Sequence, residues 1–556
     1  MRLTGRVLLA LTVAATLAIT GACAGSKGGG DHGSQNADNL TGVMNGTLPT
    51  DGPAQEGGSI TVTDLSDAPT LDVQATASSY THAALSGLVY NKLVTYKTGR
   101  DLRYGSGQLV GDLAESWTRS DDGLDWTFNL RKGVKFQDIA PVSGREFTAD
   151  DVVCTFNRSL SNPGAPGKSL LSIVDHLSTP DPYTAVFTLK EPHAAFDQSM
   201  AQIFMEIVPC EGTRGDFDMA TTAIGTGPFT LAKWDRNVQR TYAKNPNYFV
   251  PDEPHISQLN IQVMSDTAAI VAAFRSGNID MTGMTTEQQV PAITSTNPEA
   301  VIRAQMSLTM NQIMMNEKVK PFDDLRVRKA ISMAWDRVGM ANVDYSVYNL
   351  GMPYPATLDG GVTTEEANAL IPYDPDAAKA LLADAGFPNG FSVDLLTTSG
   401  YGPTVVNEAQ WLQNDLKKIG IDVTLKIVDY ATYFAGFSAM NYSIAFGYAT
   451  GLGTADEWLQ QYYLSTGSRN WFGINDPQLD SMITAQRGIL DPAARTKALH
   501  DIGIYLLTNV VNPAIGGQAN VPSVMQPWVH NLYEAPGSSR DWAAVAWVDA
   551  NSPSRK

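Results

Sequence analysis

Three neighbouring stretches of the sequence decide the fold class, and they read FSVDLL at residues 391–396, QWLQNDLKK at 410–418 and IDVTLKIV at 421–428. The third stretch alternates apolar and polar residues as a half-buried strand does, and the first also reads as a strand. The middle stretch is helical in character, and Gly420 supplies the residue type that commonly ends a helix. A strand, a helix and a strand of these lengths predict βαβ-type layers, and therefore an α/β fold class.

The sequence on either side continues this alternation of helices and strands. Residues 327–335 place apolar side chains at helical spacing, so one face of that helix is expected in the core. Asp374 and Pro375 predict a helix start, with Asp374 as N-cap and Pro375 in the first turn. Closer to the N-terminus, residues 125–130 alternate as a strand, and residues 80–90 read as a helix. Both large regions of the chain are therefore predicted to be α/β.

Length and charge limit the function classes. The chain has 556 residues, which at about 150 residues per domain corresponds to several domain-sized units. Its 39 Lys and Arg against 57 Asp and Glu give a formal net charge of −18. This balance disfavours the basic face that nucleic-acid phosphates require, so no nucleic-acid partner is expected.

The N-terminus has the layout of a secretory signal. Arg2 and Arg6 precede the apolar run 7–19, and small residues then lead to Cys23. This layout resembles a bacterial lipoprotein signal peptide over residues 1–22, with Cys23 as the lipidated first residue. An ordinary signal cleaved elsewhere is the alternative. Residues 23–57 are rich in Gly, Ser, Asn and Asp, so they predict a flexible tether that holds an extracytoplasmic body near the membrane.

The remaining two cysteines, Cys154 and Cys210, would lie in a compartment where thiols oxidise. They either form a disulfide or are two separately buried thiols, and the sequence leaves both readings open.

Markers of catalysis are missing from the sequence. The seven histidines are scattered and show no metal-ligand spacing, and there is no GxSxG, SxxK or GxxxxGK[ST] motif. Residues 225–229 (GTGPF) contain a GxG, but Pro228 and the strand-like sequence after it do not fit a phosphate-binding helix start. No cofactor, metal or enzymatic activity is therefore expected, and binding is favoured over catalysis. A secreted hydrolase with an unrecognised site is the weaker alternative.

The chain also carries a series of short landmarks in a fixed order. They comprise 113–117 (LAESW), 122–123 (DG), 126–136 (WTFNLRKGVKF), 147–152 (FTADDV), 225–229 (GTGPF), 244–249 (KNPNYF), 277–280 (GNID), 321–331 (PFDDLRVRKAI) and 374–375 (DP). In this order they resemble the extracytoplasmic solute-binding proteins of ABC transporters in the peptide/nickel class, often called family 5. The resemblance covers roughly residues 57–535.

This resemblance implies a two-lobed periplasmic-binding-protein-like fold that encloses a solute and presents it to the transmembrane permease subunits. Lobe one would comprise residues 58–305, with an extra subdomain at about 98–209, and lobe two residues 306–514. Residues 515–556 would return to lobe one. Such a protein is expected to be a monomer that closes on its ligand. A sensor protein of the same fold is a second reading.

One departure from the family concerns the ligand. In peptide-binding members, an aspartate in a loop after a strand of lobe two holds the α-ammonium of the peptide. The corresponding run here is 447–456 (GYATGLGTAD), and it places Gly451 at that position. The solute is expected to be an oligopeptide-like molecule, an oligosaccharide or another small solute, with selectivity shifted toward neutral or aromatic-stacking groups. Asp456 has two possible roles: it either reaches inward and replaces the missing acid, or it is a solvated loop residue. The expected solute contacts are Tyr80, Asn311, Tyr401, Tyr448, Thr450, Gly451, Asp456, Trp458 and Trp471.

Overall fold

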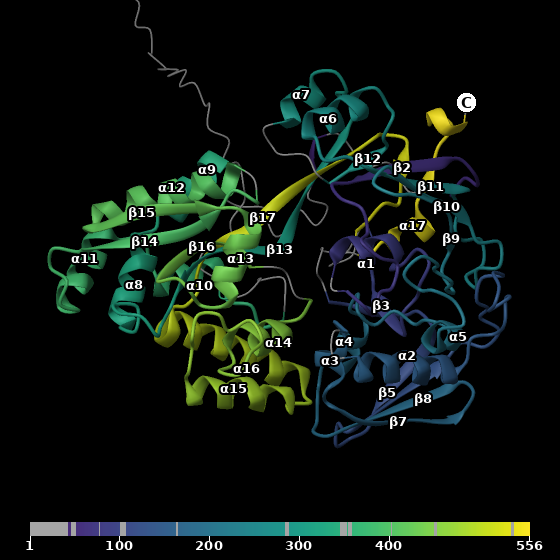
Figure 1. Cartoon of the computed structure of the whole chain (residues 1–556), viewed down its shortest axis with the longest axis horizontal. Coiled ribbons are helices and arrows are strands. Elements are labelled where there is room, and N and C mark those ends of the chain that lie inside the picture. The colour runs from purple at the N-terminus through teal and green to yellow at the C-terminus, as the bar shows by residue number, and fades with distance from the viewer. Residues whose placement is uncertain are drawn as a thin grey trace, which may run out of the picture.

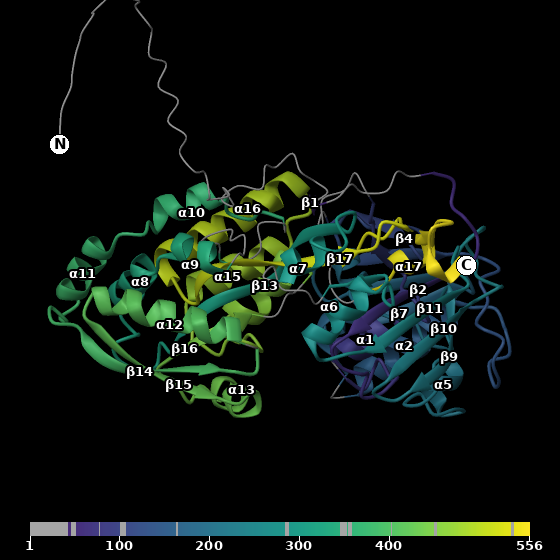
Figure 2. The same cartoon turned by 90° about the horizontal axis from the view of Figure 1, so that it is seen from above.

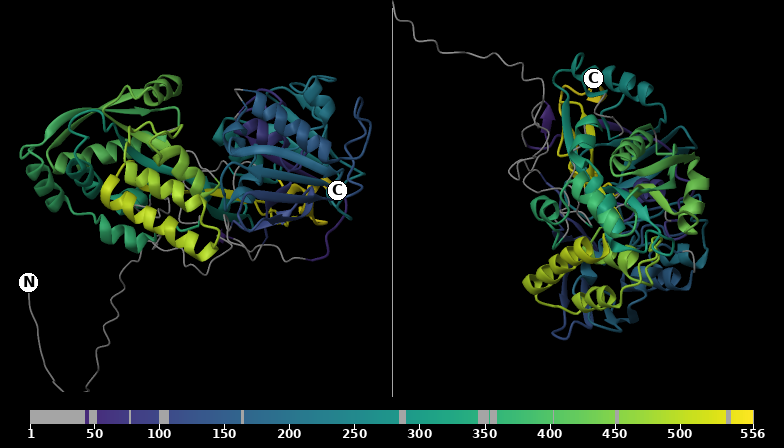
Figure 3. Two further views of the ribbon diagram at one scale, coloured as in Figure 1. Left: turned by 90° about the horizontal axis from the view of Figure 1, so that it is seen from below. Right: turned by 90° about the vertical axis from the view of Figure 1, so that its left-hand side faces the viewer.

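The computed structural model describes residues 43–45, 52–76, 78–99, 107–162, 165–283, 289–344, 353, 359–401, 403–449, 453–534 and 539–555. Figures 1 and 3 show two lobes side by side, joined by two long strands. These strands are β13 (Val301–Met315) and β17 (Ala514–Met525), which pair antiparallel with each other. The boundaries predicted at residues 305/306 and 514/515 therefore fall inside β13 and at the start of β17.

Lobe two is built on the predicted βαβ unit. Its strands β14 (Phe391–Thr398) and β15 (Ile421–Val428) run parallel and are paired along their whole length. Between them lies α12 (Pro403–Lys418), which has two lysines in its last turn. Their positive charges interact favourably with the negative end of the helix dipole and stabilise the helix. Four side chains on one face of α12 are fully buried, and each large one stabilises the lobe by about 2 kcal/mol. They are Val405, Ala409, Leu412 and Leu416.

Helices cover both faces of the lobe-two sheet, which β16 (Ile444–Ala449) connects to β13. The core on one face joins the sheet to α8 (Leu325–Ala334), α11 (Pro375–Asp384) and α12. The core on the other face involves α10 (Thr364–Leu370), α13 (Tyr430–Ser438), α14 (Ala455–Trp458), α15 (Pro477–Arg487) and α16 (Pro492–Tyr505). This second face carries most of the aromatic residues discussed below.

Lobe one continues the same sheet in the order β17, β12 (Met281–Thr282), β2 (Ser59–Asp64), β11 (Gln258–Val263), β10 (Gln239–Lys244) and β9 (Phe229–Asp235). Strand β2 is parallel to both β11 and β12. Helix α1 (Ser79–Leu85) packs here, and α6 (Thr267–Arg275) and α7 (Val290–Thr294) cover the end near β12. The prediction of a helix over residues 80–90 is wrong beyond Leu85. Gly87 has a positive φ of 74°, and a β-carbon there would lie 2.4 Å from the backbone nitrogen of Asp541, so a distant segment sets this turn.

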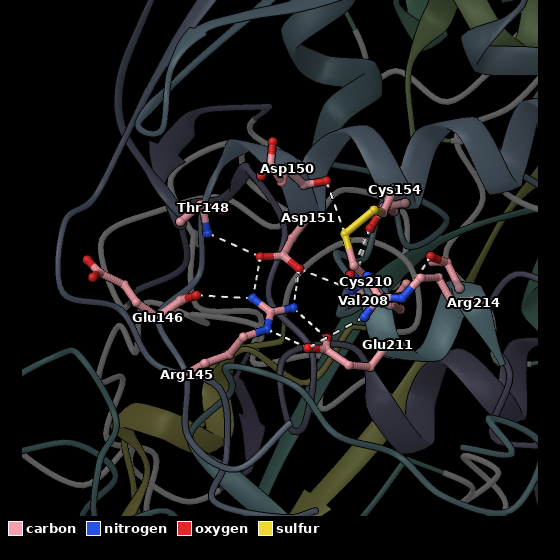
Figure 4. Close-up of polar contacts among 12 residues, drawn as sticks. Arg145, Glu146, Thr148, Asp150, Asp151, Cys154, Val208, Cys210, Glu211 and Arg214 are labelled. Carbon is pink, nitrogen blue, oxygen red and sulfur yellow. Dashed lines mark hydrogen bonds and ion pairs between the residues drawn. A yellow bond between two sulfur atoms is a disulfide. The ribbon is translucent and has the colours of Figure 1, made fainter. Parts of the chain in front are cut away.

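A separate four-stranded antiparallel sheet lies within the predicted subdomain. Its order is β5 (Ala114–Arg119), β6 (Asp125–Leu130), β8 (Thr184–Leu189) and β7 (Val174–Asp181). The helices α2 (Ala149–Ser161), α3 (Lys168–Leu171), α4 (Phe196–Met200) and α5 (Cys210–Arg214) accompany it. The structure forms the disulfide between Cys154 and Cys210, and thereby ties α2 to α5. Figure 4 shows Arg145 beside this bond, where it donates to both Asp151 and Glu211.

The remaining pairings are short. Strands β3 (Val94–Tyr96) and β4 (Leu109–Gly111) pair with each other, as do β18 (Val529–His530) and β19 (Trp547–Val548) beside α17 (Trp542–Val545).

The end of the predicted tether departs from the expectation of a flexible segment. Strand β1 (Val43–Asn45) pairs with β13, and Glu56 binds Lys244 and His255. Adding a strand to a sheet edge uses main-chain hydrogen bonds and needs no apolar pattern, so the composition could not indicate it.

Candidate functional site

The carboxyl ends of the parallel strands define an edge of lobe two. Because β14 is parallel to both β15 and β16, the segments that follow all three strands emerge at this edge. In open α/β sheets, ligands bind beyond the carboxyl ends of the strands. The segments concerned bring Tyr401 after β14, α13 after β15, and Tyr448 near the end of β16. The topology thus selects a small part of the lobe as the candidate site.

Seven aromatic residues gather at this place, and we call them the aromatic edge: Tyr401, Tyr430, Tyr433, Phe434, Phe437, Tyr448 and Trp471. The ring centroid of Tyr401 lies 5.1 Å from that of Tyr448 and 5.3 Å from that of Tyr430. Trp471 joins through Phe437, whose ring centroid is 4.7 Å away. These separations are typical of aromatic pairs that stabilise one another.

Part of the aromatic edge remains in contact with solvent. Tyr430 is 46% exposed and Phe434 is 41% exposed, although both contact other rings of the group. Figures 1 and 2 show α13, which carries both residues, on the side of lobe two that faces lobe one. Contiguous exposed apolar groups are typical of interaction surfaces, so the aromatic edge is a candidate binding surface.

Two tyrosine hydroxyls of the aromatic edge, those of Tyr401 and Tyr433, are uncharged near neutral pH. Burial raises the pKa of Tyr401, and the neighbouring Tyr430 raises it further. Burial also raises the pKa of Tyr433 well above its usual value. Each of these two hydroxyls is able to donate as well as accept a hydrogen bond, and the surface combines apolar ring faces with neutral polar groups.

Two further predicted contact residues are enclosed by the protein. Trp458 is 1% exposed and stacks on Tyr462 at a centroid distance of 4.8 Å, so its ring belongs to the core. Asn311 is also 1% exposed, and its Nδ2 donates to Glu408 Oε1 at 3.2 Å. Tyr80 lies in lobe one on α1, half-buried, and burial together with the charge of Asp64 raises its pKa. Thr450, Gly451 and Cys23 lie outside the described residues.

Asp456 takes neither of the two roles considered for it from the sequence. It is 5% exposed, and Gln486 Nε2 donates to its Oδ1. Its Oδ2 lies 3.5 Å from Arg487 Nε and 3.8 Å from Nε2 of His193, which belongs to the subdomain of lobe one. The carboxylate is thus committed to protein partners at a contact between the lobes. It is neither solvated nor free to replace the acid missing at residue 451.

This contact between the lobes involves further groups. Arg487 Nη1 donates to Glu191 Oε1 at 3.3 Å, and its backbone oxygen accepts from Ala194 N at 2.9 Å. Arg119 Nη2 donates to the backbone oxygen of Leu490 at 3.2 Å. The lobes therefore meet at a second place besides β13 and β17.

Sequence reasoning missed the two most exposed members of the aromatic edge. Tyr430 and Phe434 lie in the segment directly after the strand predicted at 421–428, so the rule for carboxyl ends of strands could have identified them.

In the described part of the chain, no cluster of three or more His, Cys, Asp or Glu side chains is arranged to hold a metal ion. No helix in the described ranges combines the length and apolar character of a membrane span.

Known proteins resemble the chain in sequence and fold. Residues 108–470 match the family described as "Bacterial extracellular solute-binding proteins, family 5 Middle". Di/tripeptide-binding protein 2 of Pseudomonas aeruginosa is 31% identical over 373 residues, 63% of this chain and 68% of that protein. Heme-binding protein A of Haemophilus influenzae is 28% identical, covering 78% of this chain and 81% of that protein. The structure of AgaA from A. tumefacien R10 in complex with agropinic acid is 26% identical with a TM-score of 0.74, covering 89% of this chain and 99% of that one. The chain belongs to the family 5 bacterial extracellular solute-binding proteins.

Proposed function

We propose that this protein is the lipid-anchored, extracytoplasmic solute-binding subunit of an ABC importer, and that it encloses its solute between the two lobes. The aromatic edge carries this proposal, because its exposed rings follow the carboxyl ends of parallel strands and belong to α13, a helix on the side of lobe two that faces lobe one. Lobes 58–305 and 306–514, with the return at 515–556, would close on the solute and present it to the permease.

The chemistry of the aromatic edge favours a neutral solute with flat apolar faces. Aromatic rings stack on sugars, amides and other rings, and the tyrosine hydroxyls add neutral hydrogen bonds. Gly451 offers no carboxylate for an α-ammonium, and Asp456 is bound to Gln486 and Arg487. A buried charge without a partner costs several kcal/mol, so a free peptide amine is disfavoured. Blocked peptides and oligosaccharides are the preferred candidates, although named relatives include di- and tripeptide-binding and heme-binding proteins.

Titration calorimetry tests both the site and the solute class. The probes are matched free and N-acetylated di- to tetrapeptides, and cello- and xylo-oligosaccharides. Tyr430→Ala should weaken binding of the best probe about tenfold, because a stacked aromatic contact contributes about 1 kcal/mol or more. Tyr373→Ala is the matched control, since Tyr373 is 45% exposed but lies outside the aromatic edge. Equal affinities for the wild type and Tyr430→Ala would refute the site. Tight binding of free peptides that acetylation abolishes would refute the solute class.

The membrane anchor is a separate part of the proposal. It rests on the basic residues, the apolar run and the small residues that lead to Cys23. Cys23→Ser should move the protein from the membrane fraction to the soluble extracytoplasmic fraction, and the wild type should carry a lipid by intact-mass measurement. A variant that remains in the membrane, together with a wild type that carries no lipid, would contradict the anchor.

A further inference from the structure

Gln312 on β13 is a buried amide whose side chain has no hydrogen-bond partner in the described protein. It is 1% exposed, and neither its Nε2 nor its Oε1 is paired. Leaving a buried polar group unpaired is costly, and nearly all such groups in folded proteins find a partner. A residue that combines two such atoms in one side chain therefore calls for an explanation.

The hydroxyl of Tyr433 on α13 shows the same property close by. Tyr433 is 1% exposed, and its Oη has no partner among the described groups. A β-carbon built on Gly447 would lie 2.2 Å from this oxygen, so the hydroxyl occupies the space where a side chain of residue 447 would be. In the antiparallel pair of β13 and β16, Gly447 is directly opposite Gln312. Opposite residues of such a pair point to the same face of the sheet, so Gln312 and Tyr433 Oη share a location.

This location adjoins the candidate site. The ring of Tyr433 belongs to the aromatic edge, with its centroid 6.1 Å from that of Tyr401. Gly447 immediately precedes Tyr448, and β16 ends two residues after Gly447. The two unpaired groups therefore lie directly behind the aromatic edge, at the carboxyl end of the sheet.

We propose that Gln312 and Tyr433 form a polar floor of the solute site, which the aromatic edge covers in this structure and which hydrogen-bonds an uncharged group of the solute, such as an amide or a hydroxyl, when the rings above it move aside on binding. This inference deepens the proposed function and rests on it. Gln312 supplies two amide hydrogens and one carbonyl oxygen, and Tyr433 supplies a hydroxyl that donates or accepts. Both groups are neutral, so the partner that satisfies them best is a neutral group that donates as well as accepts. The floor would thus select for polar neutral groups, and the aromatic edge for flat apolar faces.

The stability of the ligand-free protein separates this role from a structural one. Gln312→Leu and Tyr433→Phe remove the unpaired polar atoms and largely keep the side-chain volume, so the denaturation midpoint should stay unchanged or rise. The controls are Gln526→Leu and Tyr242→Phe in lobe one. Gln526 Nε2 donates to Phe274 O at 2.8 Å, and Tyr242 Oη donates to Ala84 O at 2.8 Å. Each control variant therefore loses a hydrogen bond that exists in the wild type, and its denaturation midpoint should fall.

Binding is measured on the same four variants, with the N-acetylated peptides and cello- and xylo-oligosaccharides as probes. Small molecules released from each denatured protein are also quantified by mass spectrometry. Gln312→Leu and Tyr433→Phe should each weaken binding about tenfold, and the lobe-one controls should bind like the wild type. A wild type that binds and releases nothing would overturn the proposed function. A wild type that binds, with floor variants that bind equally or are destabilised like the controls, would overturn only the polar floor.

Discussion

At the scale of single residues, the contact between the lobes contains a histidine in an unusual state. His193 is 3% exposed, and burial lowers its pKa to about 4, although the charge of Asp456 opposes this shift. Its Nδ1 has no hydrogen-bond partner in the described part of the protein. The imidazole is therefore held neutral at the junction of the lobes, where protonation is unfavourable in the folded state.

This state predicts a pH dependence of stability. The unfolded chain takes up a proton near the ordinary histidine pKa of 6.5, whereas the folded protein does so only near 4. The free energy of unfolding therefore includes the full contribution of His193 above pH 6.5. As the pH falls toward 4, this contribution is lost, and the free energy of unfolding decreases by about 3 kcal/mol at most. Urea unfolding of the wild type and His193→Gln at pH 7.5 and pH 5 measures this loss.

The expected result is a smaller loss of stability on acidification in His193→Gln than in the wild type. His176→Gln is the control, because the His176 side chain is 59% exposed. An equal loss of stability on acidification in the wild type and in His193→Gln would contradict the conclusion that His193 causes this pH dependence.

At the scale of elements, the sequence predicts a strand or helix correctly where the residues of that segment themselves carry the strand or helix pattern. The strands at 391–398 and 421–428 confirm the predicted strands, and the predicted helix 410–418 is the C-terminal part of α12, which begins seven residues earlier at Pro403. Alternation and Gly420 are local features, so they indicated the strands and the end of the helix, whereas the start of the helix was not predicted. The helix predicted over 80–90 ends early because residues 540–541 contact the turn around Gly87. The disulfide between α2 and α5 joins residues 56 positions apart, and no local pattern determines such a distance.

At the scale of the whole molecule, the two lobes are held together at two places. Strands β13 and β17 connect them covalently. The second contact consists of a few polar contacts around Arg487, which pairs with Glu191 and accepts a backbone hydrogen bond from Ala194. Contacts of the second kind can open without unfolding either lobe, since each lobe has its own hydrophobic core. The second contact is therefore the natural place for a hinge motion to begin.

We expect Arg487→Ala to shift the ligand-free protein toward a more open shape. The variant removes the pair with Glu191 of lobe one, besides the pair with Asp456 in its own lobe, so small-angle scattering should give a larger radius of gyration than for the wild type. Saturation with the best calorimetric probe should compact both proteins. Arg326→Ala is the control, because Arg326 is 51% exposed and pairs with Asp324 in the same lobe. An unchanged radius in Arg487→Ala, and no compaction on binding, would contradict hinge closure.

The sequence by itself determined the α/β class, the family and those strands and helices whose pattern is local, since these depend on residue type and spacing along the chain. The departure at Gly451 stays a prediction. The sequence also supplied Tyr401, Tyr448 and Trp471, which lie together in the structure. Only the tertiary structure decided that Trp458 is core, that Asp456 lies against His193 of the other lobe, and that Gln312 and Tyr433 Oη both adjoin Gly447. Burial and hydrogen bonding arise between segments far apart in the sequence, so the residue types alone do not determine which polar groups find partners.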